Sequence, residues 1–193
     1  WTRDPSSSGA RSPRLHTWRL FVLVIGFCGP LTLICPTATS QTTAARPDIL
    51  VQDFEGASYG DWTVTGEAFG TAPAKGSLPG QMEVSGYLGQ GLANSFRGGD
   101  DATGTLASPP FPIDRHYLNF LIGGGGFAGE TCINLRVDGN VVRTAAGPNT
   151  EPGGSERLRW KTWDVRDLAG KRAVIEIVDR RKGGWGHINV DQV

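Results

Sequence analysis

The stretch "TCINLRVDGNVVRTA", residues 131–145, decides the fold class. Apolar side chains at every second position from Ile133 to Val137 alternate with polar ones, which is the period of a strand with one buried face. Asp138-Gly139 then separates this run from a second one. The dipeptide favours a type I′ turn, because both central positions of that turn need a positive φ. The stretch therefore predicts an antiparallel β-hairpin.

The glycines before this hairpin match the spacing of a dinucleotide-binding fingerprint. Gly124, Gly126 and Gly129 fit G-x-G-x-x-G and follow an apolar run, residues 118–122. That fingerprint binds a pyrophosphate where its loop opens a helix, and here the loop opens a strand pattern. No Lys-Ser/Thr pair of a P-loop follows either. The pattern predicts strand, glycine loop and strand, with no nucleotide site.

The same alternation recurs in "WTVTGEAFG" (62–70), "LNFLIG" (118–123), "RLRWKTWDV" (157–165) and "RAVIEIVD" (172–179). Residues 166–170 read as a single helical turn between two strands. Many short strands with glycine-rich connections and no helical periodicity predict an all-β fold, an antiparallel β-sandwich of jelly-roll, lectin-like type. Trp62, Trp160 and Trp163 are expected in its core.

The N-terminal 40 residues differ from the rest. A basic lead precedes the apolar stretch "LFVLVIGFCGPLTLIC" (20–35), and the small residues Ala38 and Ser40 follow it. This order is typical of a secretory signal peptide, with cleavage after Ser40. A membrane anchor is the alternative, but it needs about 20 apolar residues. We predict a lead and signal at 1–40, a linker at 41–52 and one module at 53–193, with no membrane contact after cleavage.

Charge and cysteine content restrict the possible ligands and the cellular location of the protein. The chain has 19 basic and 19 acidic residues, which gives no electrostatic case for nucleic-acid binding. After cleavage only Cys132 remains, expected as a small buried hydrophobe, so no internal disulfide can form. An exported domain without a disulfide suggests a bacterial protein that is secreted, periplasmic or on the cell surface.

Polar and aromatic residues in or beside glycine-rich loops carry the strongest functional signal, since charged side chains and aromatic rings hold sugars. No motif of a serine or metallo-hydrolase occurs after the signal. The candidate binding residues are Glu67, Asp100, Arg143, Trp185 and His187. Each has a structural alternative: a solvated acid, a turn or structural calcium at Asp100-Asp101, an ion pair for Arg143, a core position for Trp185 and loop support by His187. No catalytic residue and no cofactor is predicted.

Several segments together resemble carbohydrate-binding module family 66, the fructan-binding β-sandwich attached to bacterial levanases of glycoside hydrolase family 32. They include "YGDWTVTGEAFG", "INLRVDGNVVRTAAG", "RLRWKTWDVRDLAGKRAVIEIVD" and "GGWGHINVDQV", and the similarity runs from about Asp53 to Val193. The resemblance implies a non-catalytic module that binds the terminal fructosyl unit of levan. It also implies that a separate five-bladed propeller, covalently linked, performs hydrolysis.

The resemblance transfers to particular positions. Glu67, Arg143 and the loop from Trp185 to His187 match the family's segments, and Asp100 is preferred over Asp101 as the acid that completes the site. The propeller motif Trp-Met-Asn-Asp-Pro-Asn-Gly is absent, so the catalytic domain is expected beyond Val193. Two alternatives stay open: the sandwich is itself a glycosidase, or it is a structural or adhesive domain without sugar specificity.

Overall fold

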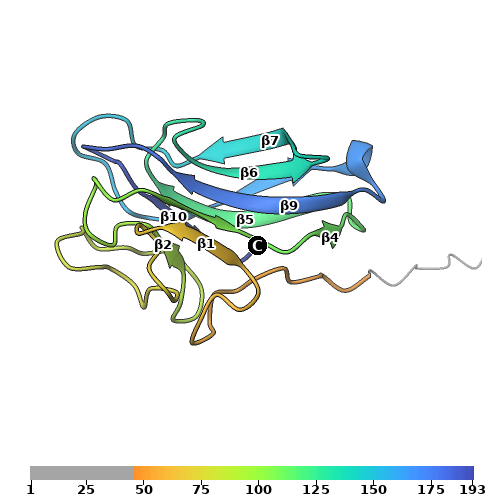
Figure 1. Ribbon diagram of the computed structural model, residues 1–193, viewed down its shortest axis with the longest axis horizontal. Helices are drawn as coiled ribbons and strands as arrows, with labels where there is room; N and C mark the ends of the chain where they lie inside the picture. The colour runs from red at the N-terminus through yellow and green to blue at the C-terminus, as the bar shows by residue number, and fades with distance from the viewer. Residues whose placement is uncertain (1–45) are drawn as a thin grey trace, which may run out of the picture. The chain divides into compact units, whose positions relative to one another are not determined.

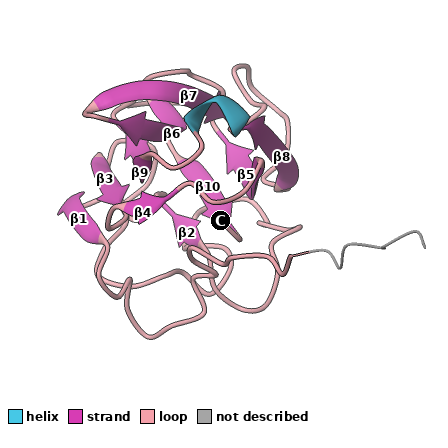
Figure 2. Ribbon diagram, turned by 90° about the vertical axis from the view of Figure 1, so that its right-hand side faces the viewer, coloured by secondary structure: helices cyan, strands magenta, loops and turns pink. Residues whose placement is uncertain are grey.

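Two antiparallel sheets pack face to face in the computed structural model, which describes residues 46–193 (Figures 1 and 2). The six-stranded sheet has the order β1-β3-β9-β6-β7, and β4 also pairs with β9. Its strands are β1 Thr63–Gly66, β3 Gly104–Ala107, β4 Phe111–Pro112, β6 Thr131–Val137, β7 Asn140–Ala146 and β9 Arg172–Asp179. The four-stranded sheet has the order β2-β10-β5-β8. Its strands are β2 Ala93–Asn94, β5 Tyr117–Gly124, β8 Arg159–Asp164 and β10 Ile188–Asp191. The predicted β-sandwich is confirmed.

The predicted hairpin is formed by β6 and β7. Asp138 and Gly139 connect the strands with φ of 51° and 79°, the positive values that the turn needs. The helical turn expected at 166–170 is also present, as the 3₁₀ helix η1, Arg166–Leu168.

The core lies between the two sheets. Ile133 and Leu135 of β6 pair with Ile177 and Ile175 of β9, and all four side chains are fully buried. Phe120 of β5, also fully buried, belongs to the same cluster. Each such side chain contributes about 1.5–3 kcal/mol through burial. The alternation read from the sequence therefore decides which face of each strand meets the core.

One tryptophan departs from the sequence prediction. Trp62 and Trp163 are buried as expected, but Trp160 is 55% exposed. Trp163 pairs with Leu118 on the core face of the sheet, whereas Trp160 pairs with Leu121 and has the opposite parity along β8. The expectation that Trp160 lies in the core is therefore wrong, because its position along β8 turns the side chain to the outer face of the sheet.

The glycines after β5 permit a close approach of backbones. A Cβ on Gly125 would lie 2.1 Å from the carbonyl oxygen of Trp185, and the Gly125 N–H donates to the His187 carbonyl at 2.8 Å. The predicted order of strand, glycine loop and strand is confirmed. Cys132, in the strand that follows, is fully buried as expected.

The N-terminal part of the described chain is hydrogen-bonded to its C-terminal residue. The compact unit spans Arg46–Val193, and the Val51 N–H donates to the Val193 carbonyl at 2.8 Å. The predicted signal peptide lies outside the described residues. Between residues 46 and 193, no helix is long and apolar enough to cross a membrane.

Candidate functional site

One end of the sandwich carries a pocket of about 520 Å³, where four connections between strands meet. They are the β1–β2, β2–β3, β7–β8 and β9–β10 connections, which gather on the left in Figure 1. The antiparallel register brings them together, since Gly104, Thr131 and Asp179 lie side by side at this end of the larger sheet. The lining residues that the following argument uses are Phe96, Asp100, Glu156, Trp185 and His187.

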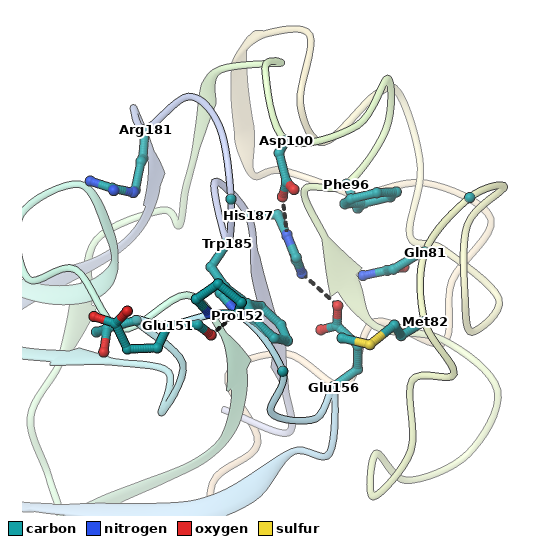
Figure 3. A pocket seen from close by; sticks show the side chains of 14 residues that line it. Gln81, Met82, Phe96, Asp100, Glu151, Pro152, Glu156, Arg181, Trp185 and His187 are labelled. Atoms are coloured by element: carbon teal, nitrogen blue, oxygen red, sulfur yellow. Dashed lines mark hydrogen bonds and ion pairs between the residues drawn. The ribbon is translucent and has the colours of Figure 1, made fainter.

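His187 stands at the centre of a charged network beside the pocket (Figure 3). Its Nδ1 lies 2.6 Å from Asp100 Oδ1, and its Nε2 lies 2.8 Å from Glu156 Oε1. Glu156 Oε2 accepts a hydrogen bond from Asn189 Nδ2 at 2.8 Å. An imidazole that donates to two carboxylates carries a proton on each nitrogen. The network is therefore a cation between two anions.

Burial makes this network energetically important. The side chains of His187 and Glu156 are only 3% and 1% exposed, whereas that of Asp100 is 33% exposed. Burial alone lowers the pKa of His187, but the hydrogen bonds and charges of Glu156 and Asp100 outweigh it, and the pKa lies above its usual value. Asp100 thus presents a partly exposed carboxylate to the pocket, fixed from behind by the imidazolium.

Aromatic rings border the same network. The Trp185 ring lies 5.5 Å from the His187 ring at 31°, and Phe96 meets the His187 ring edge-on at 4.9 Å. Trp185 has a φ of 60°, unusual for a bulky residue, and its indole N–H donates to the Glu151 carbonyl at 2.8 Å. A strained backbone held by a hydrogen bond of this kind often marks a functional site.

The structure brings together three of the five residues that the sequence singled out. Asp100, Trp185 and His187 line the pocket, but Glu67 and Arg143 do not. Glu67 is exposed just after β1, at the same end of the sandwich, and its described contacts are made by its backbone. The prediction of one pocket shared by all five side chains does not match this geometry.

Arg143 instead connects the edges of the two sheets. It lies within β7, and its guanidinium donates to the Asp164 carbonyl at the end of β8 and to the Asp167 carboxylate at 2.6 Å. Asp164 pairs with Tyr117 at the start of β5, whereas the pocket lies beyond the end of β5 at Gly124. The ion pair weighed for Arg143 as an alternative is the arrangement that the structure contains.

Glu156 and Phe96 are two of the lining residues that the sequence did not single out. Glu156 follows the glycine pair 153–154, and Phe96 precedes the glycine pair 98–99. The criterion that selected Glu67, a polar residue in a glycine-rich loop, also fits Glu156. Only the fold could rank them, because Glu156 is 2% exposed and bound to His187 while Glu67 is exposed.

No group of three or more His, Cys, Asp or Glu side chains within residues 46–193 is arranged to hold a metal ion. Both nitrogens of His187 are engaged with carboxylates, so this histidine is not available as a ligand.

Comparison with curated proteins finds a relative in Aspergillus rugulosus named "Putative glycosyl hydrolase ecdE". The two sequences are 46% identical over 149 residues, which cover 75% of this chain. The chain spans only 20% of the length of that relative. No family model matches the chain.

The fungal relative conflicts with the expected bacterial origin. That expectation came from the single cysteine of the exported part, which indicates how a fold is stabilised and not which kind of organism makes it.

Comparison with solved structures gives remote likenesses. The K1 cleaved adhesin domain of Lys-gingipain from Porphyromonas gingivalis W83 is 18% identical with a TM-score of 0.46, covering 73% of this chain and 93% of that one. A family 35 carbohydrate-binding module from Clostridium thermocellum is 14% identical with a TM-score of 0.37, covering 74% and 92%. Neither likeness bears on what this chain binds.

Proposed function

We propose that this chain is a non-catalytic carbohydrate-binding module of a longer glycosyl hydrolase, and that its pocket takes the terminal unit of a polysaccharide. The observation that carries the proposal is the pocket in which a partly exposed Asp100 carboxylate and the Trp185 ring meet around buried His187. The close sequence relationship to a protein named as a glycosyl hydrolase supports it.

The chemistry of the lining suits a sugar. Hydroxyl groups donate to a carboxylate oxygen, and aromatic rings pack against the C–H face of a pyranose or furanose ring. The Asp100 carboxylate is held by His187, so it pays little entropy when a ligand binds. The pocket lies where four loops meet at the end of the sandwich and is open to solvent, so the end of a sugar chain can reach it.

The arrangement argues against hydrolysis in this pocket. A glycosidase needs one carboxyl group to give a proton to the leaving oxygen and a second one as base or nucleophile. Here Asp100 and Glu156 each accept a hydrogen bond from the same imidazole, and Glu156 also accepts one from Asn189. Neither is presented as a free acid, so we assign binding and no catalysis to this pocket.

The finer proposal is a fructan, with a terminal fructosyl unit of levan in the pocket. It rests on the segmental resemblance to carbohydrate-binding module family 66 described above. Binding of a module to the polymer would raise the effective concentration of a linked enzyme at its bonds.

Calorimetric titration with short oligosaccharides of levan, inulin, xylan and cellulose tests both the general proposal of a carbohydrate-binding module and the finer proposal of a fructan ligand. Binding of levan oligosaccharides alone supports the finer proposal. Binding of xylan or cellulose oligosaccharides instead overturns the fructan assignment but still supports the proposal that the chain is a carbohydrate-binding module. If none of these sugars binds, or if the purified chain releases sugar from any of them, the proposed function is wrong.

A pair of variants locates the binding. Asp100→Asn should weaken binding by roughly ten- to hundred-fold, because a hydrogen bond to a charged group contributes about 1.5–3 kcal/mol. Glu67→Gln removes an exposed acid at the same end but outside the pocket, so its affinity should stay at the wild-type value. Equal losses in the two variants would contradict the assignment of this pocket.

A further inference from the structure

Gln81 lines the pocket from the β1–β2 connection, and Figure 3 shows it on the opposite side of His187 from Trp185. Its Oε1 accepts hydrogen bonds from the Leu78 backbone N–H at 3.1 Å and from Asn94 Nδ2 at 2.8 Å. Its Nε2 donates to Asn94 Oδ1 at 3.3 Å. These hydrogen bonds hold the side-chain amide in one position.

The orientation of this amide is determined by its neighbours. A backbone N–H can only donate, so the amide atom of Gln81 that faces the Leu78 N–H is the oxygen. The Phe96 N–H fixes Asn94 in the same way, because it donates to Asn94 Oδ1 at 3.0 Å. The nitrogen of Gln81 therefore faces Asn94 Oδ1, and the two ends of the amide cannot be exchanged.

One N–H of the Gln81 amide has no acceptor in the fold. An amide nitrogen carries two N–H donors, and within residues 46–193 Gln81 Nε2 donates only to Asn94. Asn189 Oδ1, on the strand paired with β2, accepts no hydrogen bond from a described residue, so it does not take the second N–H. Gln81 therefore brings an unused donor to the pocket lining, whereas Asp100 brings an acceptor.

Two paired asparagines hold the Gln81 amide beside the charged network. Asn94 of β2 is the register partner of Asn189 of β10, and directly opposite residues of an antiparallel pair have Cβ atoms about 4.5–5.5 Å apart. Asn94 holds Gln81, while Asn189 donates to Glu156 at 2.8 Å. Glu156 in turn lies 2.8 Å from His187. The unused donor and the network around His187 are thus anchored on adjacent strands.

We propose that Gln81 is a specificity-determining residue of the pocket, whose second N–H donates to an oxygen of the bound sugar while the Asp100 carboxylate accepts from one of its hydroxyl groups. This inference rests on the proposed function and refines it. The pocket then selects a sugar unit that offers an acceptor oxygen and a hydroxyl donor to two fixed partners. A site built in this way discriminates against an analogue that lacks the oxygen, because its own polar group is left unpaired.

Calorimetric titration with a methyl glycoside and its monodeoxy derivatives tests the proposal. The probe is methyl β-fructofuranoside if levan or inulin binds in the screen described above, methyl β-xyloside if xylan binds and methyl β-glucoside if cellulose binds. Gln81→Met should weaken binding of the parent glycoside by roughly two- to tenfold, the effect of one neutral hydrogen bond. Gln90→Met changes an exposed glutamine of the same connection outside the pocket, so it should bind like the wild type.

The monodeoxy derivatives separate recognition from a structural role of Gln81. One derivative should lose a similar factor with the wild type and nothing further with Gln81→Met, because the oxygen that Gln81 recognises is already absent. If Gln81→Met weakens every derivative by the same factor, Gln81 only shapes the connection and the inference alone is wrong. If no sugar of the screen binds the wild type, the proposed function is wrong and the inference falls with it.

Nuclear magnetic resonance of the wild type decides the case in which Gln81→Met fails to fold. The two side-chain N–H protons of Gln81 give separate signals, and only one of them is bonded to Asn94. The other signal should shift when the parent glycoside saturates the pocket, and should shift less with the derivative that lacks the recognised oxygen. An unchanged signal at saturation with the parent glycoside overturns the inference.

Discussion

The two ends of the sandwich both hold clusters of opposite charges, and they differ in burial. At the pocket end, the side chains of His187 and Glu156 are nearly inaccessible. At the opposite end, the side chains of Arg143 and Asp167 are 30% and 61% exposed, and Arg166 pairs with Asp164 in a similar setting. Both clusters combine acidic and basic residues, so residue type does not distinguish them.

The difference in burial determines how much each charge cluster contributes to the stability of the fold. Water screens an exposed ion pair and competes for its hydrogen bonds, so such a pair contributes little. A buried pair is poorly screened, and removal of one partner leaves an uncompensated charge in the core. The pocket end should therefore respond strongly to substitution, and the opposite end weakly.

The largest effect is expected for Glu156→Ala. It would leave the His187 imidazolium with one carboxylate and Asn189 Nδ2 without an acceptor, so the free energy of unfolding should fall by about 3–5 kcal/mol. Urea denaturation measures this loss. Glu151→Ala removes an exposed side chain from the same connection and should leave the midpoint almost unchanged. Similar midpoints for both variants would show that the buried network does not stabilise the fold.

The two ends should also respond to pH in opposite directions. The pKa of His187 is raised on folding from its usual value of 6.5. The contribution of His187 to the free energy of unfolding is therefore complete below pH 6.5, and it is lost as the pH rises through the higher pKa of the folded state. The pKa of Asp164 is lowered to about 2 by hydrogen bonds from Arg166, so its smaller, exposed contribution is lost only in acid, between about 3.8 and about 2.

Urea midpoints of the wild type and His187→Gln, measured from pH 5 to 9, isolate the contribution of His187 to stability. Asp179 adds a decline between about pH 4 and 7, because its folded pKa is raised to about 7. The decline that begins near pH 6.5 should therefore be smaller in His187→Gln than in the wild type. An equal decline in both proteins would mean that His187 is not the titrating group.

The smallest effect is expected for Arg143→Ala. The variant loses hydrogen bonds to the Asp164 carbonyl and the Asp167 carboxylate at a solvated edge, so its urea midpoint should barely change. Its affinity for an oligosaccharide that binds the wild type should also be unchanged, because Arg143 does not line the pocket. A tenfold loss of affinity in a folded variant would restore Arg143 to the binding site.

Added salt should affect the exposed ion pair of Arg143 and the buried network of Glu156 differently. Raising sodium chloride to 1 M shortens the Debye length to about 3 Å and screens charges in contact with water. The small difference between the wild type and Arg143→Ala should then vanish, while the large one caused by Glu156→Ala should remain. If both differences disappear together, the pocket network is more solvated than its burial indicates.

The sequence by itself determined the sandwich, the β6–β7 hairpin and the part that the glycines play. These features follow from local rules, because strand alternation, the positive φ of a turn and the small size of glycine act between near neighbours in the chain. The rules also placed Ile133 and Leu135 in the core. Hydrophobicity alone misplaced Trp160, because its parity along β8 directs the side chain away from the core.

Tertiary structure alone decided which polar side chains meet. Asp100, Glu156 and His187 come from three different connections, and the antiparallel register of the sheets brings those connections to one end. Glu67 and Glu156 look alike in the sequence, since both lie in glycine-rich segments. One is solvated and the other is held at 2.8 Å from an imidazole, because burial depends on how distant segments pack around a side chain and not on its neighbours in the chain.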